Sequence, residues 1–589
     1  MNFSEFPHTS YAEWLAQVLA DLKGTPAEAL DWDTGEGIIL KPYYTLEQQP
    51  FPAGDHLPVR RAGYWQSLAP GWQPVQEINL AASGAAADIQ AARDAEVHAF
   101  WLRGTPDQLA AVIPGIPLHQ SALHLGVQAS PASVAAVLRQ ALADQGTAPD
   151  QLTGTWLYDR LASALPDDHA EAAMTESAAS LAAADAWPWF RPLCVDTTWV
   201  YEQGGTLVQQ LALALGLTVE YVHGLQTRTG QPAAHILSKL AVCMPVGSLF
   251  FLEIAKFRAL RVLYTQVAEV MGATTPEAQA PFVVAVTGQW NKSRYDAPTN
   301  LLRLTTETLS AALGGVQSLI TRPYRDNPDD PAAARLSRNI HHLLQHEAVA
   351  GQVADAVGGA YYIEAATDAL ITAAWELFQR WESAGGCIAA WQQGLIPAAI
   401  TAAAATRARR VRTRQQVLTG INQYPDQSET LPDPMPTPDL RGGAVFEHIR
   451  QRADAWGLSR GQRLTACILG WGDPALQNAR RQFARNLLGC GGWVCQDIDR
   501  PESDDFQSLP PRKPDLIVLC AADADYTTDG PALIAALQTT LPEVPLVLAG
   551  KPEAWSHPAL RHHIYAGMDA ARWLDSLVPS SVVPTNVTP

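Results

Sequence analysis

The 589-residue sequence predicts an α/β protein in which a (β/α)8 TIM barrel is followed by a smaller flavodoxin-like, Rossmann-like domain. Between residues 75 and 324, eight short segments rich in β-branched and aromatic residues alternate with longer helical segments. A closed barrel requires that alternation. Beyond a segment dense in Pro, Asp and Ser, five further strand-like segments alternate with helices, which favours a second parallel sheet.

The eight predicted barrel strands are 75–80, 97–104, 123–127, 154–159, 192–199, 218–225, 282–288 and 316–324. An open, doubly wound sheet built from the same segments is the alternative. Among the helices, 248–272 has apolar side chains at three- and four-residue steps, with Glu253 and Lys256 between them. The apolar stripe comprises Phe251, Ile254, Phe257, Leu260 and Tyr264, and we expect it to face the barrel.

The second half of the chain begins with helices that run to about residue 420, followed by a predicted linker at 421–440. The five strands expected beyond it are 464–470, 492–498, 514–521, 545–550 and 562–567. We therefore expect a leading segment at 1–60, the barrel at 61–400, a helical segment with the linker at 401–460, and the flavodoxin-like domain at 461–580.

Composition excludes several classes of function. With 41 Lys and Arg against 59 Asp and Glu, the formal net charge of −18 disfavours nonspecific binding to nucleic acid or to anionic membranes. No apolar run approaches the roughly 20 residues that span a bilayer, and the first residues lack a signal-peptide pattern, so we expect a cytoplasmic protein. The seven cysteines form no CxxC pair, which indicates neither disulfides nor a thiolate metal site.

For four polar features, the sequence favours a structural role over a catalytic or ligand-binding role. His342 and His346 lie one helical turn apart but lack a third ligand, so we expect a surface or partner-facing helix rather than a metal site. The segment 288–304 favours a structural loop or subunit contact over a phosphate site. His223, expected at a strand end, is interpreted as a structural residue, and the arginines after 406 as a solvated helix face.

Several residue runs closely resemble the cobalamin-dependent acyl-CoA mutases. They are "FFLEIAKFRALRVLYTQV" (250–267), "RLSRNIHHLLQHEA" (335–348), "GGAYYIEAATDALITAAWELFQRWESAGG" (358–386) and "TGINQYP" (419–425). The resemblance extends from about residue 60 to the end of the chain. Within the family, the chain resembles methylmalonyl-CoA mutase, and more narrowly the small (β) subunit of its heterodimeric form.

The resemblance implies a cobalamin-binding domain whose cobalt ligand is the His of an Asp-x-His-x-x-Gly loop after the first flavodoxin-like strand. Here that loop reads "GWGDPALQNARR" (470–481), which places Gln477 at the His position, and no His occurs between His448 and His557. An amide oxygen is a poor substitute for imidazole on cobalt. The family's Gly-Gly pair beside the nucleotide tail is Ala549–Gly550, and its Ser-x-Leu is replaced within "LCAADAD" (519–525). We expect no cobalamin and no metal on this chain.

The barrel also departs from the catalytic members of the family. A Tyr-His pair after their fifth strand meets the substrate, and Thr198 and Trp199 stand at those positions here. Where a later strand in those members carries Arg and His toward the acyl carboxylate, this chain has Phe282 and Val284. An anionic substrate would face apolar walls without a cationic partner, at a cost of several kcal/mol. We expect no turnover by this chain alone.

The sequence thus predicts a non-catalytic small subunit that pairs with a large, catalytic subunit. The resemblance implies that the large subunit binds adenosylcobalamin and interconverts (R)-methylmalonyl-CoA and succinyl-CoA. It also implies that the leading segment, with apolar residues at helical spacing in 3–24, reaches across to the partner. Two alternatives remain: an active mutase with an unrecognised site, and a free-standing acyl-CoA-binding or regulatory protein.

Overall fold

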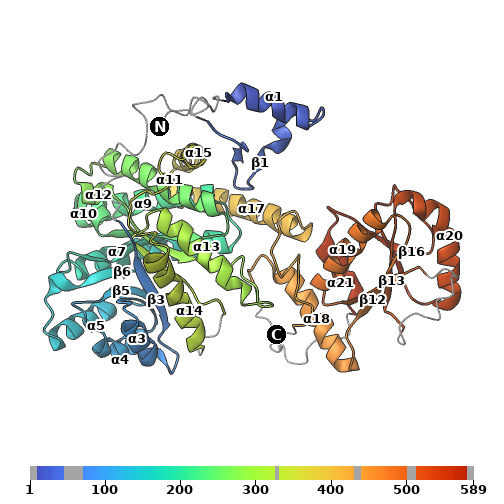
Figure 1. Cartoon of the computed structure of the whole chain (residues 1–589). Helices are drawn as coiled ribbons and strands as arrows, with labels where there is room; N and C mark the ends of the chain where they lie inside the picture. Colours follow the sequence, from blue (N-terminus) through green and yellow to red (C-terminus); the bar gives the residue numbers. More distant parts are fainter. Residues whose placement is uncertain (1–8, 46–69, 326–329, 430–438, 501–512, 580–589) are drawn as a thin grey trace. The chain divides into compact units, whose positions relative to one another are not determined.

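The computed structural model describes residues 9–45, 70–325, 330–429, 439–500 and 513–579 (Figure 1). The chain forms two compact units. One comprises Met1–Gln289 and Leu301–Ala403, and the other comprises Trp290–Asn300 and Ala404–Pro589. The second unit thus includes a short piece of chain that lies, in sequence, between two barrel elements. Within the described ranges, no helix combines the length and apolarity needed to cross a membrane.

A parallel sheet that nearly closes on itself forms the centre of the first unit. Its strands are β3 (Gln73–Asn79), β4 (Ala99–Gly104), β5 (Ala122–Val127), β6 (Thr153–Trp156), β7 (Phe190–Arg191), β8 (Leu193–Asp196), β9 (Leu240–Val246), β10 (Phe282–Thr287) and β11 (Ser318–Ile320). They lie in the order β7-β6-β5-β4-β3-β11-β10-β9-β8. Only Pro192, which has no N–H to donate to a ladder, separates β7 from β8. These two edges are therefore parts of one strand, and the predicted barrel is confirmed.

Seven of the eight predicted barrel segments contain a strand, but the prediction for 218–225 is wrong. These residues lie in α9 (Leu207–Thr229), a helix that begins with a capping box at Thr206 and ends at Gly230, whose φ is +69°. Tertiary packing of a long buried helix outweighs the β propensity of the local residues. The sixth barrel strand is instead β9, and His223 is an exposed helical residue rather than one at a strand end.

Helix α11 (Phe250–Val270) packs against both α9 and α15 (Tyr361–Ser383). Four residues of its predicted stripe are buried: Ile254, Phe257, Leu260 and Tyr264. Phe251 is 52% exposed, contrary to the expectation. Glu253 and Lys256 are buried too, because they face the end of β9 and α9: Glu253 accepts from the N–H of Gly247, and Lys256 donates to the carbonyl of Pro245. The two side chains form an ion pair with a 2.5 Å separation between Oε2 and Nζ.

The second unit contains the predicted five-stranded parallel sheet. Its strands are β12 (Thr465–Gly470), β13 (Val494–Asp499), β14 (Leu516–Cys520), β15 (Leu546–Ala549) and β16 (Leu560–Ile564). Their order, β13-β12-β14-β15-β16, is that of a flavodoxin-like sheet. The helices α19 (Pro474–Cys490) and α20 (Asp523–Thr540) connect strands, while α18 (Ala444–Arg460) precedes β12 and α21 (Ala570–Leu577) follows β16.

The arginines at the end of α17 (Leu395–Arg412) contact the second unit's own residues, so the expectation of a solvated face is wrong for part of this run. The guanidinium of Arg407 lies 3.5 Å from the ring centroid of Trp290. Arg412 donates to Asp569 at 2.6 Å. The cations serve as internal contacts because the second unit offers them an aromatic face and a carboxylate.

The polar segment 288–304 also contributes to the second unit. The Tyr295 hydroxyl donates to Asp454 at 2.8 Å, and the backbone N–H of Arg294 donates to Glu447 at 2.7 Å. Both carboxylates come from α18. These contacts support the interpretation of this segment as a structural loop.

Candidate functional site

The carboxyl ends of barrel strands are where enzymes of this fold place their chemistry. Thr198 and Trp199 lie there, in the short helix α8 (Thr198–Glu202) that follows β8. The Trp199 ring, however, makes an edge contact with Trp391 of α16 (Cys387–Gln392) at 5.8 Å. It also packs against the large cluster formed by helices and barrel strands, and not against the separate cluster that contains Val284. These two positions place no ionisable side chain at the barrel mouth.

The barrel interior is apolar at its middle level. Val284 is fully buried in a cluster that also includes Val75, Cys194, Cys243 and Ile320. Phe282 is partly buried and packs against the same cluster. An anion placed there would lose its hydration without gaining a partner from these residues.

One cation inside the barrel was not identified from the sequence. The guanidinium of Arg191 lies 4.0 Å from the ring centroid of Phe282, the first residue of β10, and is therefore near the amino-terminal end of that strand. Burial lowers the pKa of Arg191 to about 10. Arg191 therefore lies near the amino-terminal ends of the strands, whereas Thr198 and Trp199 lie beyond their carboxyl ends.

Tyr201 covers the mouth of the barrel. The residue is 3% exposed and belongs to α8. A Cβ atom on Gly247, just beyond β9, would lie 2.6 Å from the Tyr201 ring, and one on Gly288, just beyond β10, would lie 2.2 Å from it. Two glycines far apart in the sequence thus let the ring rest on the backbone at the ends of two neighbouring strands.

The charged groups around this mouth form pairs of opposite charge. Arg103 bonds Glu77 at 2.6 Å. Arg322 lies 4.0 Å from Glu202, whose carboxylate also accepts a 2.7 Å bond from the backbone N–H of Gln289. Burial raises the pKa of the nearby Asp196. Cations already paired with carboxylates are poorly suited to recognise an acidic substrate, because the substrate must displace an existing partner.

Gln477 lies in the first turn of α19. Asp473 caps this helix by accepting from the N–H groups of Ala475 and Leu476 at 3.0 and 2.9 Å. The Gln477 amide donates back to the carbonyl of Gly472 at 3.3 Å. The side chain at the expected ligand position is thus hydrogen-bonded to the backbone of the loop that precedes its helix.

A cavity of about 520 Å³ lies beside this loop. Its lining residues are Gly470, Trp471, Gly472, Gln477, Asp499, Arg500 and Asp529. The cations here are again paired: Arg500 with Asp529 at 3.7 Å, and Arg481 with Asp499 at 2.5 Å. The cavity has no imidazole and no thiol among its lining residues.

Ala549 lies at the carboxyl end of β15 and is contacted by Tyr526, a residue that the sequence did not indicate. The hydroxyl of Tyr526 is 2.9 Å from the Ala549 carbonyl and 3.1 Å from that of Leu519. Tyr526 is fully buried. Its position in "LCAADADY" could have suggested a role, but only the fold brings β14 and β15 together at this hydroxyl.

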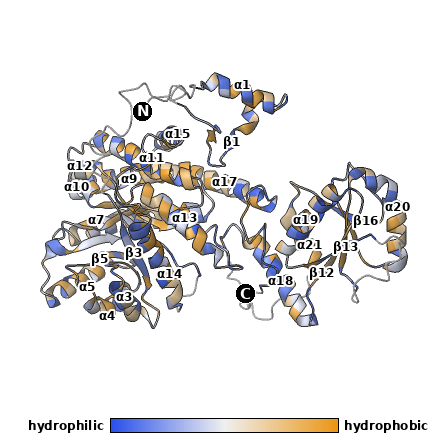
Figure 2. Cartoon of the chain, viewed as in Figure 1, coloured by the Kyte–Doolittle hydropathy of each residue, from blue (hydrophilic) through white to orange (hydrophobic). Residues whose placement is uncertain are grey.

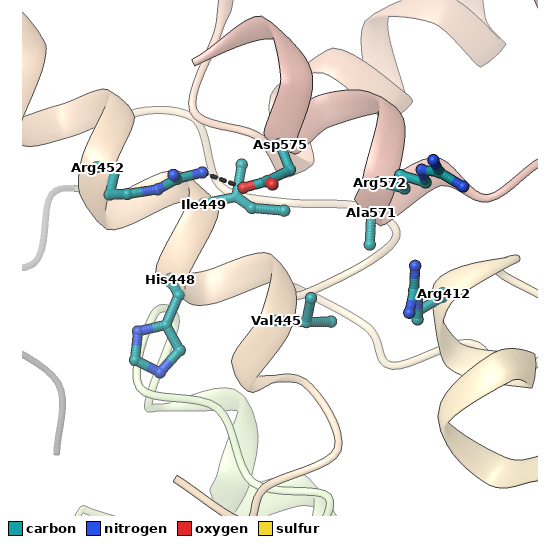
Figure 3. A pocket seen from close by; sticks show the side chains of 8 residues that line it. All are labelled: Arg412, Val445, His448, Ile449, Arg452, Ala571, Arg572 and Asp575. Carbon is teal, nitrogen blue, oxygen red and sulfur yellow. Dashed lines mark hydrogen bonds and ion pairs between the residues drawn. The ribbon is translucent and has the colours of Figure 1, made fainter. Parts of the chain in front are cut away.

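A second cavity in this unit, of about 390 Å³, is rich in arginine (Figure 3). Its lining residues are Arg412, Val445, His448, Ile449, Arg452, Ala571, Arg572 and Asp575. Figure 3 shows Arg452 paired with Asp575. Arg412 is paired with Asp569 at 2.6 Å. Because carboxylates offset two of the three guanidinium groups, the cavity has little excess charge with which to hold an anion.

The histidine pair and the cysteines are two further sets of side chains capable of binding a metal. The rings of His342 and His346 stack with centroids 5.9 Å apart. Across the described ranges, no cluster of three or more His, Cys, Asp or Glu is suited to hold a metal ion. Burial raises the pKa of all seven cysteine thiols, which favours the unreactive protonated form.

Comparison with known proteins places these features in context. The family model described as methylmalonyl-CoA mutase matches residues 104–453, more than half of the chain. The chain belongs to the methylmalonyl-CoA mutase family. Its relatives include the methylmalonyl-CoA mutase small subunit of Porphyromonas gingivalis, 29% identical over 93% of each chain, and that of Streptomyces virginiae, 29% identical over 97% of each chain. A methylmalonyl-CoA mutase of Rhizobium meliloti is 26% identical over 85% of this chain and 76% of its own length.

The residues of this methylmalonyl-CoA mutase family member do not fit the cofactor that the family implies. Gln477 offers cobalt an amide that is already bonded to Gly472. The carbonyl groups of Ala549 and Leu519 are hydrogen-bonded by the Tyr526 hydroxyl, so they do not face a space that is free for a cofactor.

Proposed function

We propose that this chain is the non-catalytic small subunit of a heterodimeric methylmalonyl-CoA mutase. One observation carries the proposal: the positions that catalytic members use for chemistry hold Thr198, Trp199 and Val284, and Tyr201 covers the mouth above them. Similarity along nearly the whole length of two named small subunits supports the same assignment.

In this proposal, the partner subunit binds the cofactor and catalyses the reaction. A small subunit implies a large one, and we propose that the large subunit holds adenosylcobalamin and interconverts methylmalonyl-CoA and succinyl-CoA. The Gln477 amide and the buried Tyr526 support a chain that binds no cobalamin itself. The contribution of this chain is then to stabilise and position its partner through a protein interface.

The amino-terminal helix supplies a surface for that interface. Helix α1 (Tyr11–Asp21) begins with a capping box at Ser10, yet none of its residues is buried. Figure 2 shows hydrophobic and hydrophilic residues together on it. Trp14 contacts Tyr11 at 5.4 Å and Tyr43 at 5.0 Å, and Leu19 is 44% exposed. Aromatic side chains that find little cover in their own chain are typical of an interface with another protein.

The chain that follows α1 is anchored on the barrel. Glu36 accepts a 2.7 Å bond from the N–H of Leu207 at the start of α9, and Leu40 is 1% exposed. The anchor fixes where the segment leaves the barrel, while α1 keeps its apolar side chains available. This arrangement supports docking of α1 on a partner chain.

Co-expression with the mutase large subunit from the same source tests the proposal. We expect the two chains to co-purify at one-to-one stoichiometry, and this chain alone to convert no methylmalonyl-CoA even with adenosylcobalamin added. Turnover by the isolated chain would contradict the proposal in favour of an active mutase. A stable monomer that ignores the large subunit but binds acyl-CoA would instead support a regulatory protein.

A further inference from the structure

The carboxyl edge of the second sheet has an unusual occupant. Flavodoxin-like sheets bind ligands beyond the carboxyl ends of their strands, at the point where the strand order reverses, which here lies between β12 and β14. Backbone groups at this edge have no partner within the sheet and are normally satisfied by the ligand, by water or by nearby side chains.

The hydroxyl of Tyr526 contacts three backbone groups near this edge, one of which, the Leu519 carbonyl, belongs to a residue that is also paired in the β14–β15 ladder. Its oxygen accepts a 3.0 Å bond from the N–H of Ala521 and lies within reach of the carbonyls of Leu519 and Ala549. A phenol donates one proton at a time, so the two carbonyls share it. Burial raises the pKa of Tyr526, which keeps that proton in place.

Aromatic neighbours hold the Tyr526 ring. Trp471, after β12, contacts it edge-on at 5.6 Å, and Trp555, after β15, stacks on it at 6.0 Å. Gly530 makes room for Trp555, because a Cβ there would lie 2.7 Å from the indole. Arg480 lies 5.0 Å from the Tyr526 ring and donates to the Ala521 carbonyl at 2.5 Å.

We infer that this aromatic plug, comprising Trp471, Tyr526, Trp555 and Arg480, is a built-in substitute for a bound ligand at the edge of the sheet. It fills the space beyond β14 and β15 with side chains drawn from three connections and from α19, and it borders the cavity of about 520 Å³ at the end of β12. The second unit therefore reaches its full stability without a cofactor. The inference concerns how this unit folds and does not depend on the partner proposed above.

Removal of the ring tests the inference in the full-length chain. Tyr526→Ala should lower the melting temperature of the second unit by about 10 °C or more, since it leaves a cavity and removes the hydrogen bonds of the Tyr526 hydroxyl. Added p-cresol, which has the shape and hydroxyl of the missing side chain, should recover part of that loss, as small apolar guests occupy engineered cavities. Leu537→Ala, in the same helix and core but away from the edge, is the matched control.

We expect p-cresol to raise the melting temperature of Tyr526→Ala alone. The melting temperature of the wild type should not change with p-cresol or with hydroxocobalamin. If Tyr526→Ala does not fold, Tyr526→Phe keeps the ring and should melt a few degrees below wild type through its lost hydrogen bonds. A Tyr526→Phe variant as stable as wild type, equal rescue of the Leu537→Ala control, or stabilisation of wild type by hydroxocobalamin would each overturn the inference. Association with a large subunit plays no part in these outcomes, so they are independent of the proposed function.

Discussion

A Cβ atom added to Gly288 would lie 2.2 Å from Cε1 of Tyr201, so the tyrosine ring rests directly on the backbone that follows β10. This contact joins a helix after the fifth barrel strand to the end of the seventh. It covers the position from which a catalytic barrel would reach its substrate. The Tyr201 ring is buried at this point, with 3% of the residue exposed.

Gly288→Ala should therefore destabilise the barrel. The added methyl group forces the Tyr201 ring out of its place, and overpacking of this kind costs about 1–3 kcal/mol. Urea unfolding of the variant measures the loss. Tyr201→Ala creates space at the same point, so the double variant should lose clearly less than the sum of the two single variants. Strict additivity would show that the two residues do not pack as described.

Restoring the family's substrate-contacting pair should not restore turnover. In Thr198→Tyr/Trp199→His, the new histidine occupies a position whose present side chain faces Trp391 rather than the barrel interior. The interior would keep its apolar wall at Val284, and catalytic groups act non-additively. We expect no methylmalonyl-CoA conversion by the purified double variant, monitored with adenosylcobalamin present. Measurable conversion without a partner would show that the site has been misjudged.

The cobalamin prediction can be checked by absorption spectroscopy. Hydroxocobalamin mixed with the isolated chain should keep the spectrum of the free cofactor, because Gln477 supplies no imidazole. Gln477→His alone should leave the spectrum unchanged, since Tyr526 still bonds the carbonyls of Leu519 and Ala549. A shifted spectrum at one-to-one stoichiometry, with protein imidazole on cobalt, would contradict both statements.

Sequence patterns predicted seven barrel strands and all five strands of the second sheet, because each is a short β-rich run bounded by turns. The error at 218–225 arose where a buried helix contains residues that also favour strands. Tyr201, Arg191 and Tyr526 were missed for a different reason. Their roles depend on contacts with residues far away in the chain, such as Gly288, Phe282 and Ala549, and no local spacing encodes such contacts.

Two buried histidines should make the barrel sensitive to acid. Burial lowers the pKa of both His124 and His341 to about 3, below the ordinary value of 6.5. The unfolded chain then binds protons that the folded chain excludes, so their stabilising effect is complete above pH 6.5 and is lost as the pH falls toward 3. Each histidine should cost about 1.4 kcal/mol per pH unit within that window.

His341→Gln isolates one of these two contributions. The Nδ1 atom of His341 accepts a 3.0 Å bond from the Trp72 indole, and a glutamine oxygen can accept the same bond without titrating. Asp159, whose pKa burial raises to about 7, acts in the opposite direction in both proteins and cancels in the comparison. Urea unfolding at pH 7.5 and pH 5.0 should therefore show a smaller acid loss for the variant, by about 2 kcal/mol. An unchanged loss would mean that His341 is protonated in the folded state.

The last prediction concerns α1 and the assembly. Deletion of residues 1–40 should weaken co-purification with the large subunit, but it also removes Glu36 and the buried Leu40, which anchor the segment on the barrel. A narrower change is therefore more informative. Trp14→Ala removes the ring that joins Tyr11 and Tyr43 on a helix with no buried residue, so it should leave the melting temperature nearly unchanged.

The same Trp14→Ala change should weaken binding to the large subunit by about 2 kcal/mol or more, roughly 30-fold in Kd, if Trp14 is a hot spot of the interface. Gln17→Ala, an exposed change on the same helix, is the control and should bind as wild type does. Titration calorimetry or a pull-down at graded concentrations measures the difference. If Trp14→Ala binds as tightly as the control, α1 lies outside the interface. If wild type shows no association with its own large subunit, the small-subunit assignment itself fails and the regulatory alternative becomes the stronger one.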